Sequence, residues 1–223
     1  MSIAAALGPC LPMPMGIIVN PRGTNGAGKT ELVRRLVAGL PLTPILRPGR
    51  PLPIAYRVEG PFPFIILGHY ERTSGGCDTI PLRDGGPDEV FRLADQYAED
   101  IPVLLEGALL SREVTRTAAL AAHHEVHVIC LATPLDACVR NLLARRRAGP
   151  GARDTTLARV ATLHAAIDAA AARLAPVATV AHLPFDLALA RARELLATDR
   201  TGRHAGLCPA PRQGQDPWTA KCL

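Results

Sequence analysis

Residues 23–30 read Gly-Thr-Asn-Gly-Ala-Gly-Lys-Thr, and they constrain the fold of this chain more than any other stretch. The pattern G-x-x-x-x-G-K-T is that of a phosphate-binding loop, or P-loop. An apolar, β-branched run at residues 16–19 precedes the loop, and residues 31–37 follow it with apolar positions at helical spacing. This order turns backbone N–H groups and the positive end of a helix dipole toward an anion. We therefore expect a nucleotide-binding site here.

The loop gives its residues distinct roles. Lys29 is expected to reach the β- and γ-phosphates, and the Thr30 hydroxyl is expected to hold Mg²⁺. A chance glycine-rich turn is the alternative, and the strand and helix patterns on either side argue against it. The predicted ATP-binding residues are Gly23, Thr24, Asn25, Gly26, Ala27, Gly28, Lys29 and Thr30.

Length and composition indicate a globular domain. The chain has 223 residues, enough for one α/β domain with a tail. Its net charge of +5 permits a polyanionic partner without establishing one. The six cysteines form no C-x-x-C pair and no zinc spacing, so we expect reduced thiols in a cytosolic protein. No apolar run approaches the roughly 20 residues that cross a bilayer. We expect an unstructured extension at 1–14, the domain at 15–197 and a disordered tail at 198–223.

Strand and helix patterns alternate along the domain. The expected strands are 16–19, 54–58, 62–67, 101–105, 126–131 and 177–180, with the second and third forming a hairpin. The expected helices are 29–40, 87–100, 111–122 with Ser111 as its cap, 133–147, 157–174 and 187–197. Residues 41–53 contain five prolines and are expected to form a connector or lid-like loop, not a strand. This alternation predicts a P-loop NTPase fold, a doubly wound, mostly parallel sheet with helices on both faces.

Two acidic residues are candidates for catalysis. Glu106 directly follows a buried strand, so it should lie beside the P-loop, where it could order Mg²⁺ through water or act as a base. A surface carboxylate at a strand end is the alternative. Asp78, in Gly-Gly-Cys-Asp-Thr, is the rival base, since paired glycines permit close approach to a ligand. Its alternative is the turn chemistry that Asp favours.

Basic residues end the helix expected at 133–147. They could form a lid that places guanidinium groups on a transferring phosphoryl group, or they could simply complement the helix dipole. Among these basic residues, Arg145 is the catalytic candidate. The run comprises Arg140, Arg145, Arg146 and Arg147.

Aromatic side chains, scarce elsewhere, gather near the expected hairpin. Phe62, His69 and Tyr70 could line a pocket for the acceptor base. Packing of the hairpin is the alternative.

The P-loop, residues 103–107 and 131–136, Arg140 and the arginine run together resemble small P-loop kinases of the thymidylate-kinase-like group, over about residues 15–197. Residues 22–26 and 75–80 are similar to a phage-encoded branch that includes the 5-hydroxymethyl-deoxyuridine (5-hmdU) DNA kinases. That resemblance implies phosphorylation, from ATP with Mg²⁺, of the hydroxymethyl group of 5-hydroxymethyluracil within DNA. It also implies a step towards hypermodified thymidines that protect viral DNA from restriction, in the host cytoplasm. The Asp-Arg-[Tyr/Phe/His] acceptor motif of ordinary thymidylate kinases is missing.

Other functions remain open at this point. A kinase for a free nucleoside or nucleotide would share the fold and differ only in its acceptor. A regulatory ATPase is a third possibility, although the sequence contains no N-K-x-D or L-S-G-G-Q motif. The sequence predicts no membrane association and does not determine the oligomeric state.

Overall fold

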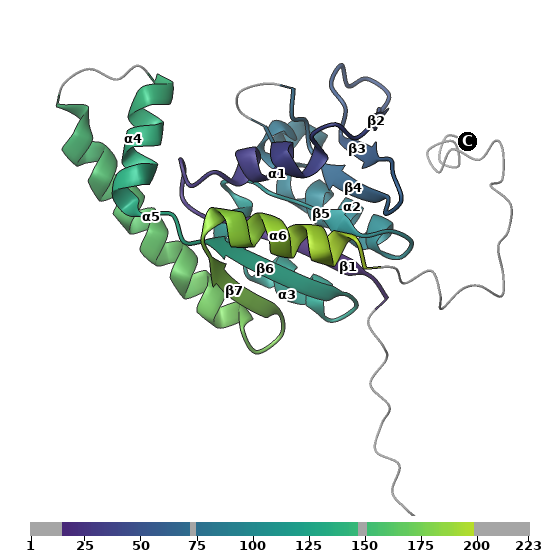
Figure 1. Ribbon diagram of the computed structural model, residues 1–223. Coiled ribbons are helices and arrows are strands. Elements are labelled where there is room, and N and C mark those ends of the chain that lie inside the picture. Colours follow the sequence, from purple (N-terminus) through teal and green to yellow (C-terminus); the bar gives the residue numbers. More distant parts are fainter. Residues whose placement is uncertain (1–14, 72–74, 147–150, 199–223) are drawn as a thin grey trace, which may run out of the picture.

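The computed structural model describes residues 15–71, 75–146 and 151–198. They form a mixed α/β fold around a seven-stranded sheet of order β2-β3-β4-β5-β1-β6-β7 (Figure 1). Neighbouring strands are parallel from β4 through β7, and β3 is antiparallel to both of its neighbours. The strands are β1 Ile17–Arg22, β2 Leu42–Ile45, β3 Ala55–Val58, β4 Phe64–Leu67, β5 Val103–Leu104, β6 Glu125–Leu131 and β7 Thr179–Leu183.

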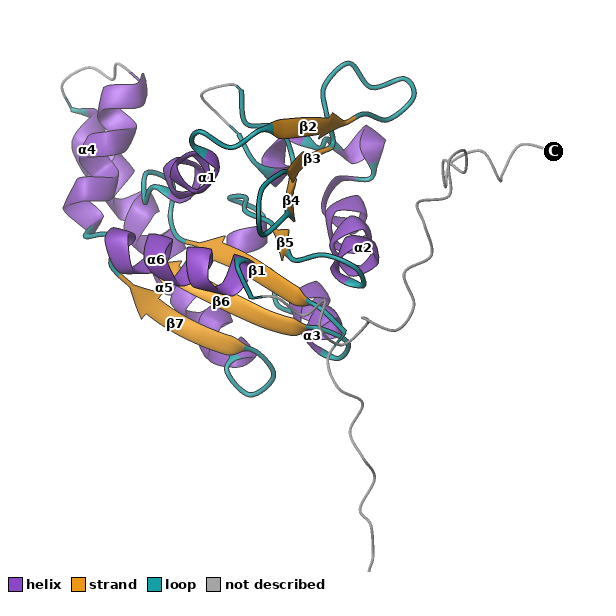
Figure 2. Ribbon diagram, turned by 45° about the vertical axis from the view of Figure 1, so that its right-hand side comes forward, coloured by secondary structure: helices purple, strands orange, loops and turns teal. Residues whose placement is uncertain are grey.

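Helices cover both faces of this sheet, which is why its central strands are almost wholly buried. Successive β1 residues alternate between two cores, with Ile17 and Val19 in one and Ile18 in the other. The first core packs against α1, α4 and α6, and the second against α2 and α3 (Figures 1 and 2). The helices are α1 Lys29–Val37, α2 Gly86–Ala98, α3 Thr115–Ala121, α4 Leu135–Arg146, α5 Ala152–Leu174 and α6 Phe185–Leu196. The expected sheet with helices on both faces is confirmed.

Parallel pairing brings several strand ends to one side of the sheet. The C-terminal ends of β4, β5, β1 and β6 lie together there, because these strands run in the same direction. We call this end of the parallel strands the site edge. It carries the segments 23–28, 68–71, 105–111 and 132–134.

The prediction that residues 41–53 contain no strand is wrong. Residues Leu42–Ile45 form the edge strand β2, antiparallel to β3. The Glu59 N–H donates to the Pro41 carbonyl at 2.9 Å. In this antiparallel register the backbone groups of the odd-numbered residues of β2 therefore face β3, and those of Pro44 face away from the sheet. A proline at the free edge of a sheet removes no ladder hydrogen bond, and this explains why the strand tolerates it.

Ser111 is not a helix cap. The α3 helix begins at Thr115, later than expected, after a short 3-10 turn at Leu110–Arg112. The buried Ser111 hydroxyl donates instead to the Gly107 carbonyl at 2.9 Å. The hairpin expected around residues 59–61 is confirmed by the antiparallel β3–β4 pair.

Helix α4 and the first part of α5 pack against each other and project from one end of the sheet, whereas the rest of α5 continues along the sheet and places Ala171 and Leu174 in the second core (Figures 1 and 2). Arg153 of α5 donates to the Asp136 carboxylate of α4 at 2.8 Å. Within the described ranges, no helix combines the length and the apolar character that crossing a bilayer requires. The expectations for 1–14 and 199–223 fall outside the described residues.

Truncating the fully buried Ile66, in β4, should destabilise the fold. We expect Ile66→Ala to lower the free energy of unfolding by about 2–5 kcal/mol, because it loses buried methyl groups and leaves a cavity. Leu187→Ala, at a position 58% exposed on α6, is the matched control and should change it by less than about 0.5 kcal/mol. Urea denaturation measures both, and equal effects would contradict this account of the core.

Candidate active site

The glycine-rich loop, residues 23–28, joins β1 to α1 at the site edge. Gly26 and Gly28 have φ values of 83° and 100°, a left-handed region that side chains rarely adopt. A Cβ at Gly26 would overlap the Cys138 carbonyl of α4. Glycine is therefore required there both by the backbone and by the close approach of α4.

Lys29, the first residue of α1, is nearly buried at 7% exposure. Its Nζ donates to the carbonyls of Gly23 at 2.8 Å and Thr24 at 3.2 Å. Burial lowers the pKa of this amine, and the charges of Glu106 and Asp78 partly offset that effect. The cation thus lies inside the loop at the positive end of a helix, an arrangement suited to phosphate.

Glu106 lies beside this cation because β5 pairs with β1, and both strands end at the same edge. Its Oε1 accepts a hydrogen bond from the Thr30 hydroxyl at 3.0 Å, and the residue is only 1% exposed. Burial raises the pKa of the Glu106 carboxyl to about 7, although Lys29 and the Thr30 hydrogen bond oppose the rise. A carboxyl that titrates near neutrality can exchange a proton at physiological pH.

Asp78 reaches the same region from the segment after β4. The Cys77 N–H donates to the Glu106 carbonyl at 2.8 Å, which holds this segment against the end of β5. The exposed Asp78 carboxylate accepts the N–H groups of Ala108 at 2.6 Å and Leu109 at 3.3 Å. Asp78 therefore has a structural role whether or not it also acts as a base.

The glycine pair 75–76 lets this segment lie over the catalytic candidates. Gly76 has a φ of 85°, and a Cβ there would overlap the Glu106 carboxylate. A Cβ at Gly75 would lie 3.1 Å from the Thr30 side chain. These glycines therefore allow the segment to approach the Glu106 and Thr30 side chains closely, and the close approach to a ligand expected from the sequence stays a prediction.

In the sequence, Arg22 was noted only in the motif at residues 22–26, and its burial was not predicted. It is fully buried (0% exposed), and burial lowers its pKa to about 10. Its Nε donates to the Asn20 side chain at 2.6 Å and a terminal nitrogen donates to the Thr117 hydroxyl at 2.7 Å. Asn20 in turn donates to the Leu105 carbonyl at 2.7 Å, one residue before Glu106. This network joins the end of β1 to the end of β5.

Helix α4 contacts the other side of the loop. Asn141 donates to the Gly26 carbonyl at 2.9 Å, and Thr133, just before the helix, donates to the Ala27 carbonyl at 2.8 Å. Neither residue carried a sequence signal for this role. The loop is thus held by hydrogen bonds from the segment that bears the arginines.

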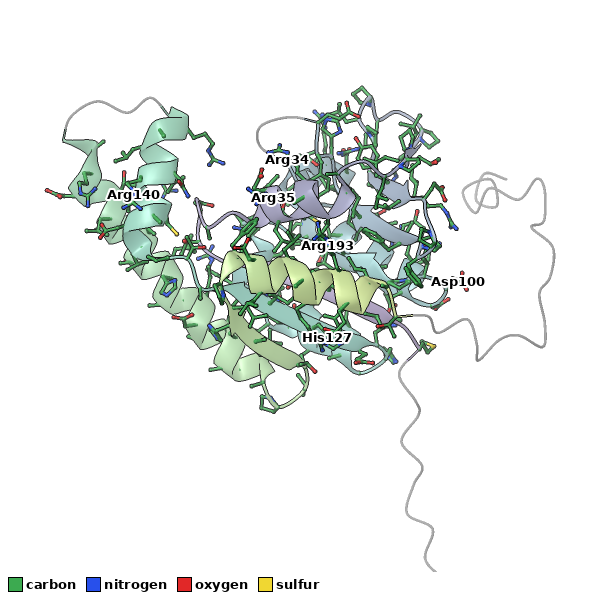
Figure 3. All side chains as sticks on the ribbon, viewed as in Figure 1. Arg34, Arg35, Asp100, His127, Arg140 and Arg193 are labelled. Atoms are coloured by element: carbon green, nitrogen blue, oxygen red, sulfur yellow. The ribbon has the colours of Figure 1, made fainter. Side chains whose placement is uncertain are left out.

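Of the arginine run, Arg145 is exposed in the last turn of α4, and its charge contributes to lowering the pKa of Lys29. Arg140 is also exposed on this helix (Figure 3). Arg147 and the side chain of Arg146 lie outside the described residues. The lid interpretation therefore stays a prediction.

Of the three aromatic candidates, His69 and Tyr70 lie at the site edge and are buried, whereas Phe62 is separated from them. His69 is buried and its Nδ1 is 2.7 Å from the Tyr56 hydroxyl, which also donates to Glu71 at 3.1 Å. Tyr70 is buried in the core against α1, where its hydroxyl has no partner among the described residues. Phe62 is half-exposed and precedes β4, on the side of the sheet opposite the site edge. Phe62 therefore lacks the position that an acceptor pocket on the site edge requires.

The oxygen atoms beside the loop fit a magnesium ion. The Thr30 hydroxyl and the Glu106 carboxylate converge, and Mg²⁺ prefers a few hard oxygen ligands with several waters. Across the described ranges, no group of three or more His, Cys, Asp or Glu side chains could hold a metal by itself.

A comparison with known proteins finds a related phage enzyme. A 5-hmdU DNA kinase from Pseudomonas phage PaMx11 is 42% identical over 134 residues, which cover 58% of this chain and 69% of the phage protein. No protein-family model matches the chain.

The raised pKa of Glu106 predicts a pH dependence of stability. Its folded-state pKa, about 7, exceeds the ordinary value of 4.5, so the folded state binds the proton more tightly. The free energy of unfolding should therefore fall as pH rises through this window, by up to about 3 kcal/mol. Glu106→Gln, which has no carboxyl to titrate, should lack that part of the slope. Urea denaturation from pH 4.5 to 8 compares the two, and parallel curves would refute the assignment.

Proposed function

Because the chain belongs to the family of 5-hmdU DNA kinases, we propose that it transfers the γ-phosphoryl group of ATP to the hydroxymethyl oxygen of 5-hydroxymethyluracil in DNA. The chain is a phosphotransferase. The observation that carries the proposal is the convergence of Lys29, Thr30 and Glu106 at the glycine-rich loop. The fold itself, with a parallel sheet and its loop at a strand end, supports assignment to the P-loop NTPases.

The donor nucleotide would lie along the loop. Backbone N–H groups of the loop and the Lys29 amine, at the start of α1, would supply hydrogen bonds and positive charge to the phosphates. Magnesium held near Thr30 and Glu106 would neutralise phosphate charge when bound. ATP and Mg²⁺ are thus the proposed donor and metal.

Glu106 is the base that the geometry favours. In the proposed reaction the hydroxymethyl oxygen bonds to the γ-phosphorus, and the bond from that phosphorus to the β–γ bridging oxygen breaks, releasing ADP. The hydroxyl proton passes to the Glu106 carboxylate, whose pKa of about 7 suits acceptance near neutrality. Asp78, whose carboxylate already accepts two backbone N–H groups, orients the turn beside Glu106.

Arg145 is the proposed cation on the opposite side of the transferred group. It lies on α4, which is attached to the loop through Asn141. A guanidinium there would stabilise charge on the transferring phosphoryl oxygens. Its contribution would then appear in kcat more than in KM.

The acceptor is proposed to be DNA, supported by the name of the related enzyme and by the net charge of +5. The product would be an intermediate towards hypermodified thymidines that protect phage DNA from restriction in the host cytoplasm. Relationship to a kinase argues against a regulatory ATPase. A free nucleotide as acceptor is the alternative that the following experiment distinguishes.

With γ-labelled ATP and Mg²⁺, the wild-type protein should label DNA that contains 5-hydroxymethyluracil and leave matched thymine DNA unlabelled. Lys29→Ala should reduce the rate by about 100-fold or more, because the phosphates lose their buried cation. Arg173→Ala, which removes an exposed charge at the far end of α5, should retain activity. Label in free 5-hmdU or its monophosphate, with none in DNA, would replace the proposed acceptor, and label nowhere would reject the proposed reaction.

Gly76→Ala tests the contact of the glycine pair with Glu106. The added methyl group would overlap the carboxylate, and we expect kcat to fall by about 100-fold because small displacements of reacting groups are costly. Gly39→Ala is a matched control, since Gly39 has a similar φ of 77° but an added methyl group there would have no neighbour within 4 Å. Steady-state kinetics on the modified DNA measures both variants. Equal effects would show that backbone strain, not the contact with Glu106, is responsible.

A further inference from the structure

Leu109 is an exposed leucine on the site edge, in a turn that hydrogen bonds hold in place. It is 59% exposed and lies three residues after Glu106. Single exposed leucines are common on protein surfaces. Leu109 differs from an ordinary surface leucine because the turn that carries it is fixed by hydrogen bonds on two sides.

The turn at 107–111 is held from its outer and inner sides. On the outer side, the Asp78 carboxylate accepts the N–H groups of Ala108 and Leu109. Within the turn, the Ser111 N–H and hydroxyl donate to the Gly107 carbonyl at 3.2 and 2.9 Å. On the inner side, the buried Arg22 guanidinium donates to the Ser111 carbonyl at 3.4 Å. The turn therefore presents an apolar side chain in a fixed position, which lowers the entropic cost of using it in binding.

The depth of Glu106 constrains how DNA can approach. Its exposure is 1%, and a hydroxymethyl group extends from its base by only one carbon and one oxygen. A base stacked within a duplex that rests on the site edge would leave this oxygen short of the carboxylate. If the acceptor is DNA, as proposed above, the target base must leave the stack.

A base that leaves the stack creates a gap, and apolar side chains of DNA-bending proteins insert between base steps. We propose that Leu109 enters the duplex stack at the position vacated by the target base and holds that base in the site. Arg112, in the same turn and exposed, places a cation where the adjacent DNA backbone would pass. The inference rests on the proposed function.

Leu82 is the other candidate nearby, since it is 84% exposed in the 3-10 turn Leu82–Asp84. It is four residues beyond Asp78, whereas the Leu109 N–H donates directly to the Asp78 carboxylate. The firmer attachment of Leu109 beside Glu106 favours it. Leu82→Ala therefore serves as a variant that separates the two.

The test compares kcat/KM on three DNA substrates that share one sequence around 5-hydroxymethyluracil. These are a single strand, a fully paired duplex, and a duplex with an abasic site opposite the target. Leu109→Ala should lose about tenfold or more on the paired duplex, less on the abasic duplex and nothing on the single strand. Leu40→Ala changes an exposed leucine (37%) between α1 and β2, at the end of the sheet opposite the site edge. This variant should match the wild type on all three substrates.

Each contrary outcome has a distinct meaning. An equal loss on all three substrates, no loss on any, or a duplex-specific loss in Leu82→Ala alone would overturn the role of Leu109. Wild-type activity on the single strand only would also overturn it, because no stack is then entered. If wild type phosphorylates none of the three, the proposed function itself fails.

A binding measurement gives a second readout without chemistry. The fluorescence of 2-aminopurine next to the target base in the paired duplex should rise when the wild-type protein binds and unstacks the base. Leu109→Ala should bind but give less than about half of that rise, and Leu109→Phe should restore it. An unchanged rise in Leu109→Ala would refute insertion.

Discussion

The buried guanidinium of Arg22 is the constraint on which the arrangement of the site depends. A charge removed from water is costly unless its hydrogen bonds are satisfied, and Arg22 satisfies them with neutral partners on α3, on its own strand and on the turn after β5. Through Asn20 the same network reaches the Leu105 carbonyl. The ends of β1 and β5 are therefore joined by polar bonds that have few alternative arrangements. Lys29 lies beyond the end of β1 and Glu106 beyond the end of β5, so the network joins the two strand ends from which the site is built.

Most of the fold could be predicted from local patterns. Buried parallel strands are continuous apolar runs, and each was flanked by turn residues and a helical pattern, as for β6 and α4. The strand β2 could not be predicted in this way, because its residues are exposed and include a proline. Its existence depends on the neighbouring hairpin, to which it adds at a free edge. The Ser111 cap was wrong for a related reason, since its hydroxyl is used by a turn that no local pattern indicates.

Part of the candidate site could likewise be predicted from the sequence, and part could not. That Lys29, Thr30 and Glu106 meet follows from the motif and from the rule that parallel strands end at one edge. The bond from Asn141 to the loop, between residues 115 positions apart, depends on how the α4 helix leaves β6 and could not be read from spacing. Phe62 was grouped with His69 because they are close in sequence. The intervening strand carries them to opposite sides of the sheet.

The proline in β2 also affects how copies of the protein behave at high concentration. An edge strand normally offers alternating donors and acceptors that a second sheet could extend. Pro44 removes the outward donor in the middle of a four-residue strand, so a neighbouring chain would find too few consecutive partners to continue the ladder. The sheet is thus terminated chemically at this end. Pro44, which made β2 difficult to predict from the sequence, thus protects the folded protein against aggregation through edge-to-edge pairing of sheets.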